Sequence, residues 1–142
     1  MTIKVELKNV DRLGVFLRRI EEAAKPEGAL DEIGAVLLNR TRKRFLATQD
    51  PDGKPWIESA AARARANKGR GGKTLFDTGT LFHSIQLSRR GPLERALETD
   101  VPYAPDHQKG TRRLPQRQFL GFSDADQDIM VKILEARLRK VV

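Results

Sequence analysis

Two long stretches of apolar residues at helical spacing most constrain how this chain can fold. One runs from about residue 29 to 47 and the other from 124 to 140, and in each the apolar positions recur every three or four residues. A helix with an apolar stripe must bury it against another layer, so both helices are expected to pack on one core. Ser123 is expected to cap the second helix, with Asp126 three residues on giving a near capping box.

The other layer of this core is predicted to be an antiparallel sheet. Residues 3–7 alternate apolar and polar side chains, which indicates a strand with one buried face. Residues 85–89 and 95–101 predict two further strands, and the short turn at Gly91-Pro92 joins them into a hairpin. The three strands together provide a surface on which the helices can bury their apolar stripes.

A third amphipathic helix is expected before residue 29. Asn9 or Asp11 can cap it, and Pro26 followed by Gly28 ends it. The resulting order is strand, two helices, loop, hairpin, irregular segment and helix. This order predicts an α+β fold in which amphipathic helices pack on an antiparallel sheet. The length of 142 residues favours a single domain spanning residues 1–142.

One stretch, residues 60–74, is expected to form a long mobile basic loop. Its early part can begin as a short helix, but its end is rich in glycine and in Lys/Arg. Such a segment has too little apolar surface to offset the entropy lost on ordering. Its cations, which have no acidic residue among them, are Arg63, Arg65, Lys68, Arg70 and Lys73.

The charge balance leaves two interpretations open. The formal net charge is +8, which attracts polyanions but is also typical of a solvated surface. The five cations of residues 60–74 are candidate nonspecific DNA contacts. Aromatic residues make up only 6% of the chain, none lies among these cations, and no helix-turn-helix or zinc-finger pattern is present. A protein that reads a specific base sequence is therefore not expected.

No catalytic, cofactor or metal site is expected. The chain has no cysteine and two histidines, His83 and His107, so it cannot assemble the four N or S ligands of a structural zinc site. Asp106 and His107 are adjacent, and neighbours in sequence seldom orient each other as a triad requires. Gly72-Lys73-Thr74 matches the end of a phosphate-binding loop, but Asn67 stands where the first glycine of such a loop is required. Because neither an export signal nor a long apolar run is visible, a soluble protein without membrane contact is expected.

Three segments, taken in order and spacing, resemble the phage virion morphogenesis family. They are DPDGKPW at Asp50–Trp56, LFDTGTLFHSI at Leu75–Ile85, and YAPDHQKG followed by LPQRQFLGFSDAD between Tyr103 and Asp126. The similarity covers most of the chain. That family usually has Arg-Pro-Phe-Leu-Gly where this chain has Arg117-Gln118-Phe119-Leu120-Gly121. The absence of the proline leaves the turn less rigid.

The resemblance implies a non-enzymatic structural protein of a phage or prophage tail. It would act at the head-proximal end, in tail completion or head–tail joining. Its partners would be itself, as a homo-oligomeric ring, and other tail and head–tail connector proteins. It would lie in the cytoplasm of the host bacterium during assembly and then in the virion tail. The alternative is a basic nucleic-acid-binding protein that uses residues 63–73.

The family motifs also give a set of candidate interface residues. They are Trp56, Gly79, Leu81, Tyr103, His107, Gln108, Gly110, Arg112, Arg113, Arg117, Phe119, Leu120 and Gly121. Tyrosine and arginine are among the residue types that dominate protein interfaces. A second interpretation stays open, in which Tyr103, His107 and Phe119 pin the segment to the sheet of their own subunit. Trp56, the only tryptophan, is expected to anchor its loop on the core.

Overall fold

The computed structural model describes residues 3–6, 15, 27–70, 73–76 and 78–141. Within these residues the strands are β1 (Ile3–Glu6), β2 (Gln86–Gly91) and β3 (Glu94–Thr99). The helices are α2 (Glu27–Leu46), α3 (Ala60–Asn67), α4 (Thr80–Ser84), α5 (Ala104–Lys109) and α6 (Asp124–Val141). The predicted α+β class is confirmed. The N-terminal helix predicted before residue 29 lies outside the described residues, apart from residue 15.

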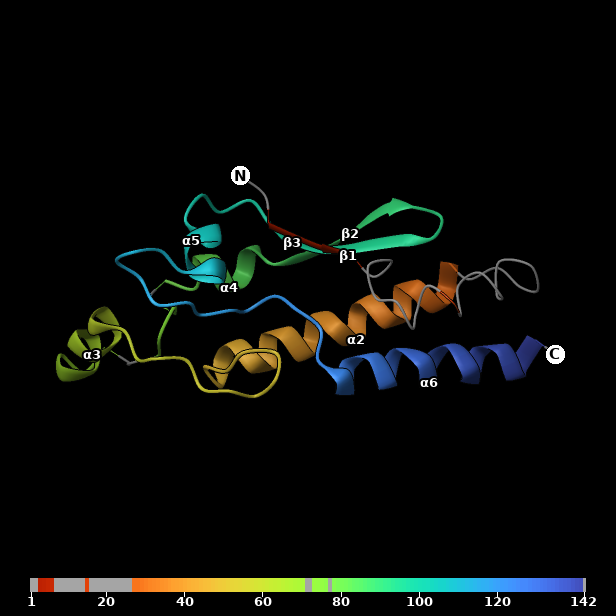
Figure 1. Cartoon of the computed structure of the whole chain (residues 1–142), viewed down its shortest axis with the longest axis horizontal. Helices are drawn as coiled ribbons and strands as arrows, with labels where there is room; N and C mark the ends of the chain where they lie inside the picture. The colour runs from red at the N-terminus through yellow and green to blue at the C-terminus, as the bar shows by residue number, and fades with distance from the viewer. Residues whose placement is uncertain (1–2, 7–14, 16–26, 71–72, 77, 142) are drawn as a thin grey trace.

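The sheet has the strand order β1-β3-β2, and both pairings are antiparallel. The predicted hairpin is therefore confirmed as β2 and β3, with Leu87 opposite Leu97. The register shifts between Arg89 and Gly91, next to the predicted turn. β1 pairs with the other edge of β3, from Ile3 opposite Thr99 to Glu6 opposite Ala96 (Figure 1). The central strand is thus the last of the three in the chain.

Helix α2 lies between the sheet and α6, which runs antiparallel to it (Figure 1). Its buried face has the predicted spacing and consists of Ala29, Leu30, Ile33, Gly34, Leu37, Thr41 and Phe45. Gly34 faces β2 at close range, since a Cβ there would come within 2.7 Å of the methyl groups of Leu87. The small residue therefore allows α2 to pack directly on β2.

The predicted cap of α6 is confirmed and also joins two helices. The Ser123 amide donates to Asp126 Oδ2 at 2.9 Å, and the Asp126 amide donates to Ser123 Oγ at 3.1 Å. Arg40 Nε and Arg44 Nη2 of α2 donate to Asp126 Oδ1 at 2.6 and 2.5 Å. Burial acts to raise the pKa of Asp126, but the hydrogen bonds from Arg44, Ser123 and Arg40 outweigh it and hold that pKa below its usual value.

Two segments differ in detail from the sequence prediction. Residues 104–109 form helix α5, where the sequence predicts irregular structure. Pro105 occupies the first turn of this helix, where its missing N–H costs no hydrogen bond. In the stretch 60–74, residues 60–67 form α3, and the Ser59 hydroxyl caps it by accepting from the Ala62 amide at 3.0 Å. The mobility of this stretch stays a prediction.

Candidate assembly surface

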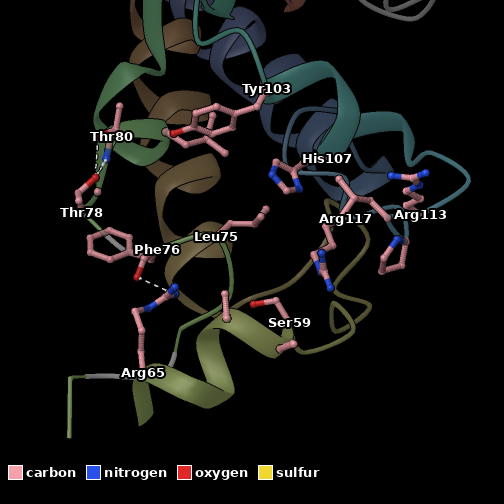
Figure 2. Close-up of a pocket in the computed structure, with 16 residues that line it drawn as sticks. Ser59, Arg65, Leu75, Phe76, Thr78, Thr80, Tyr103, His107, Arg113 and Arg117 are labelled. Atoms are coloured by element: carbon pink, nitrogen blue, oxygen red, sulfur yellow. Dashed lines mark hydrogen bonds between the residues drawn. The ribbon is translucent and has the colours of Figure 1, made fainter. Parts of the chain in front are cut away.

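Two of the three family-like segments, Leu75–Ile85 and Tyr103–Asp126, meet at one hollow, here called the motif pocket. It has a volume of about 490 Å³ and is lined by residues from the segments 59–65, 75–81, 103–107 and 113–117 (Figure 2). These segments come from α3, from the chain entering α4, from α5 and from the chain that follows α5. Residues separated by more than fifty positions therefore build a single concave surface at the end of the molecule that carries α3 (Figure 1).

The wall of the motif pocket is largely apolar and aromatic. Leu75, Phe76 and Leu81 line one side, and Phe76 stacks edge-on against Phe82 with ring centroids 5.3 Å apart. Tyr103 lines the pocket although 46% of its surface is exposed. A large aromatic side chain that stays half in water beside an apolar hollow is typical of a protein interface.

His107 and Arg117 form the polar side of the motif pocket. Among the described residues, His107 Nδ1 is buried without a hydrogen-bond partner. Burial lowers the pKa of His107, the charge of Arg117 lowers it further, and Asp106 raises it in part. Burial and the charge of Arg117 therefore both favour the neutral imidazole. Arg117 is nearly fully buried, and its Nε donates to the Ile57 carbonyl oxygen at 2.7 Å, which fixes the guanidinium beside the pocket (Figure 2).

A second group of motif residues holds the segment that follows α5 in place. Gln108 Oε1 accepts from the amides of Phe119 and Leu120 at 3.1 and 3.0 Å, and Gln108 Nε2 donates to the Leu120 carbonyl at 2.6 Å. Gly110 follows α5 with φ of 77°, and a Cβ there would lie 2.9 Å from the Gln116 amide nitrogen. Trp56 is buried, as predicted, and its Nε1 donates to the Gln118 carbonyl at 2.8 Å.

The predicted interface residues thus separate into two groups. Those that line the motif pocket are Gly79, Leu81, Tyr103, His107, Arg113 and Arg117. Those that lie outside its lining are Trp56, Gln108, Gly110, Arg112, Phe119, Leu120 and Gly121. Phe119 and Leu120 are fully buried in the core, whereas Arg112 is exposed. The interpretation that Phe119 pins its own segment therefore agrees with its burial, whereas Tyr103 faces outward.

Several lining residues were not among the predicted ones. Leu75, Phe76, Leu114 and Pro115 lie inside the segments that carry the family resemblance, so the bounds of those segments were the available signal. Ser59, Ala60 and Ala61 also line the pocket. No pattern in the sequence marks these three, because they reach the pocket only through the position of α3.

The five candidate DNA contacts do not form one free basic patch. Arg65 lines the motif pocket, and its Nη2 donates to the carbonyl oxygen of Lys73 at 2.8 Å. Lys73 Nζ donates to the Leu46 carbonyl at 2.8 Å. Arg63 Nε lies 3.6 Å from Glu58 Oε2, and both side chains are exposed. Three of the five cations are therefore engaged locally, while Lys68 and Arg70 are exposed.

Two features are absent from the part of the chain that the structure describes. No cluster of three or more histidine, cysteine or acidic side chains there is placed to hold a metal ion. None of the helices there combines the length and the hydrophobicity needed to cross a bilayer.

Comparison with known proteins gives one match. The model of the phage virion morphogenesis family matches residues 6–139, which is nearly the whole chain. Comparisons with curated proteins and with solved structures gave no match.

Proposed function

Because the chain belongs to the phage virion morphogenesis family, we propose that it completes the phage tail at its head-proximal end and prepares it to join the head. The family consists of structural morphogenesis proteins, not enzymes, and its members interact with other virion proteins. The tail-completion step is our assignment within that role.

The observation that carries the proposal is that two of the three family-like segments, Leu75–Ile85 and Tyr103–Asp126, meet at the motif pocket. The fold depends on buried residues such as Phe119, but it does not depend on an exposed tyrosine and cations around a hollow. Interfaces concentrate these residue types, and large apolar hollows on monomers commonly mark contact sites. The motif pocket is therefore the surface on which we place contacts with other assembly components.

We further propose that the protein works as a homo-oligomeric ring that contacts tail and head–tail connector proteins. A ring of identical subunits uses two different faces of each subunit and leaves one end free to contact a partner. Assembly would take place in the cytoplasm of the host bacterium, and the protein would remain in the virion tail.

Deletion and complementation in the parent phage or prophage test the proposed role. Without the protein, we expect separate heads and incomplete tails in electron micrographs, and the wild-type chain supplied in trans should restore joined particles. Normal joined particles in the deletion strain would contradict the tail-completion role. Light scattering on the purified protein, across concentration and at two salt concentrations, tests the ring, for which a discrete oligomer mass is expected.

A further inference from the structure

The motif pocket is at once apolar and positively charged. Leu75, Phe76 and Leu114 provide apolar wall, while Arg65, Arg113 and Arg117 provide the cations. No carboxylate is present among the described residues that line it. A hollow of about 490 Å³ falls in the size range that holds a few side chains of a bound segment.

Two side chains are placed to meet an anionic group in this pocket. Figure 2 shows Arg117 next to the imidazole of His107 and Arg113 farther out on the same side of the hollow. The buried Nδ1 of His107 has no hydrogen-bond partner among the described residues, which leaves an unsatisfied polar atom on the polar side of the pocket. Arg113 is exposed, so its guanidinium can turn toward a bound carboxylate and form a bidentate pair.

We propose that the motif pocket binds an apolar segment of another virion protein, in which a carboxylate follows an aromatic or aliphatic side chain. The apolar side chain would fill the hollow between Phe76 and Leu114, and the carboxylate would pair with Arg113 and Arg117. This inference rests on the proposed function, because it assigns a partner to the same surface.

The charge of the chain favours a different protein over a second copy as the occupant. The chain carries 27 Lys and Arg against 19 Asp and Glu, so a second copy would on average bring further positive charge to a pocket that already holds arginines, whereas ring contacts can use other faces of the subunit. An acidic segment of another protein is attracted by the same field and can pair with Arg113 and Arg117. DNA offers phosphates but no apolar side chain to fill the hollow.

Peptide binding to the purified full-length protein tests the chemistry of the pocket. The probe is acetyl-Leu-Phe-Asp-Leu-amide, compared with the same peptide carrying Asn or Lys in place of Asp. By NMR titration we expect the Asp peptide to shift the signals of His107 and Leu114. The Asn peptide should bind roughly tenfold more weakly, because it loses the charge-assisted pair, and the Lys peptide should not bind. Equal binding of the three peptides, or shifts elsewhere on the molecule, would overturn the proposal.

A charge swap locates the recognition at Arg113. In Arg113→Glu we expect the preference to invert, so that the Lys peptide binds and the Asp peptide does not. Lys109→Glu is the matched control, since Lys109 is exposed, lies close by in the chain, does not line the pocket and gives the same change in net charge. If both variants lose the Asp peptide to the same extent, the effect comes from the overall field and the proposal fails.

Complementation and light scattering then identify the occupant. We expect Arg113→Glu to reduce joined particles at least tenfold relative to Lys109→Glu while the oligomer mass stays unchanged. A fall in oligomer mass caused by Arg113→Glu would make the occupant a second copy and overturn the proposal, as would normal joining by that variant. The proposed function fails on a different result. In that case the strain that lacks the protein still makes complete tails, independently of whether the peptides bind.

Discussion

Gln108 shows how a single side chain can hold an irregular segment in place. It lies on α5, and its amide group makes hydrogen bonds with both backbone groups of Leu120 and with the amide of Phe119. Phe119 packs edge-on against Phe45 of α2 with ring centroids 5.9 Å apart. The segment has no strand to satisfy its backbone groups, so Gln108 takes the place of a neighbouring strand.

Removing the Gln108 amide should therefore destabilise the fold. We expect Gln108→Ala to lower the free energy of unfolding by about 2–3 kcal/mol, since two backbone amides lose their acceptor in a partly buried place. Gln116→Ala is the control, because Gln116 is exposed and its side chain makes one bond, to the Gln108 carbonyl at 3.2 Å. Urea unfolding at pH 7 measures both. Equal losses for the two variants would contradict this role of Gln108.

His107 should make stability depend on pH in a narrow window. Its pKa in the folded protein is lowered by burial and by Arg117, so the unfolded chain binds a proton more readily. The free energy of unfolding should therefore fall as pH drops below about 6.5, the usual pKa of histidine, and level off below the lowered value. Asp126 affects the free energy of unfolding in a separate pH range. Because its pKa in the folded protein is lowered, its stabilising contribution is present above about pH 4 and is lost as the pH falls further.

Urea unfolding at pH 7.5, 6.5, 5.5 and 5.0 measures this dependence. We expect His107→Gln to flatten the profile between pH 6.5 and 5.0, because the group that protonates on unfolding is gone. His83→Gln serves as the control, since His83 is exposed and lies on α4. A profile unchanged by His107→Gln would show that another group causes the acid sensitivity.

At the scale of elements, the contact between α2 and α6 depends on one buried carboxylate. Asp126 is fully buried and binds Arg40 and Arg44 of α2 as well as the Ser123 amide of its own cap. The cap itself follows from the local spacing of Ser123 and Asp126. The two arginines could not be assigned to Asp126 in advance, because they lie more than eighty residues away and only the packing of the helices brings them close.

Loss of one partner of this cluster should cost more than loss of a surface cation. We expect Arg44→Ala to lower the free energy of unfolding by about 3 kcal/mol, because the buried carboxylate of Asp126 loses its closest cation. Lys43→Ala changes an exposed neighbour and should stay within about 0.5 kcal/mol of the wild type. Thermal and urea unfolding at pH 7 give both values. A loss below about 1 kcal/mol for Arg44→Ala would mean that Arg40 alone neutralises Asp126.

The elements also show where sequence reasoning succeeds and where it stops. The stripe of α2 and the β2–β3 hairpin are predictable, because periodicity and a two-residue turn signal are local properties. Helix α5 is six residues long, too short for a periodic pattern, and it begins beside a proline. The motif pocket is not predictable from local patterns either, since α3 reaches it only through tertiary packing. The other three segments that line the pocket lie within two stretches that carry the family resemblance, Leu75–Ile85 and Tyr103–Asp126.

At the scale of the whole molecule, the net charge is +8, and the five cations of residues 60–74 contribute to it without forming one free basic patch. Of the cations in residues 60–74, Arg65 and Lys73 donate to carbonyl oxygens and Arg63 lies near Glu58. Lys68 and Arg70 remain exposed and are the two of this group best placed to meet an external phosphate. Two phosphate contacts support weak, strongly salt-dependent binding and no sequence preference.

The double variant Lys68→Glu/Arg70→Glu separates this weak attraction from the proposed function. We expect it to weaken retention of duplex DNA in a low-salt binding assay and to lower the salt dependence, because about two phosphate contacts are lost. Tail joining in the complementation assay should stay close to the wild-type level, since neither residue lines the motif pocket. Lys54→Glu/Lys109→Glu makes the same change in net charge at exposed positions elsewhere and should affect DNA retention less. Loss of tail joining together with DNA binding in the first variant, but not in the second, would instead make DNA contact by residues 63–73 part of the function.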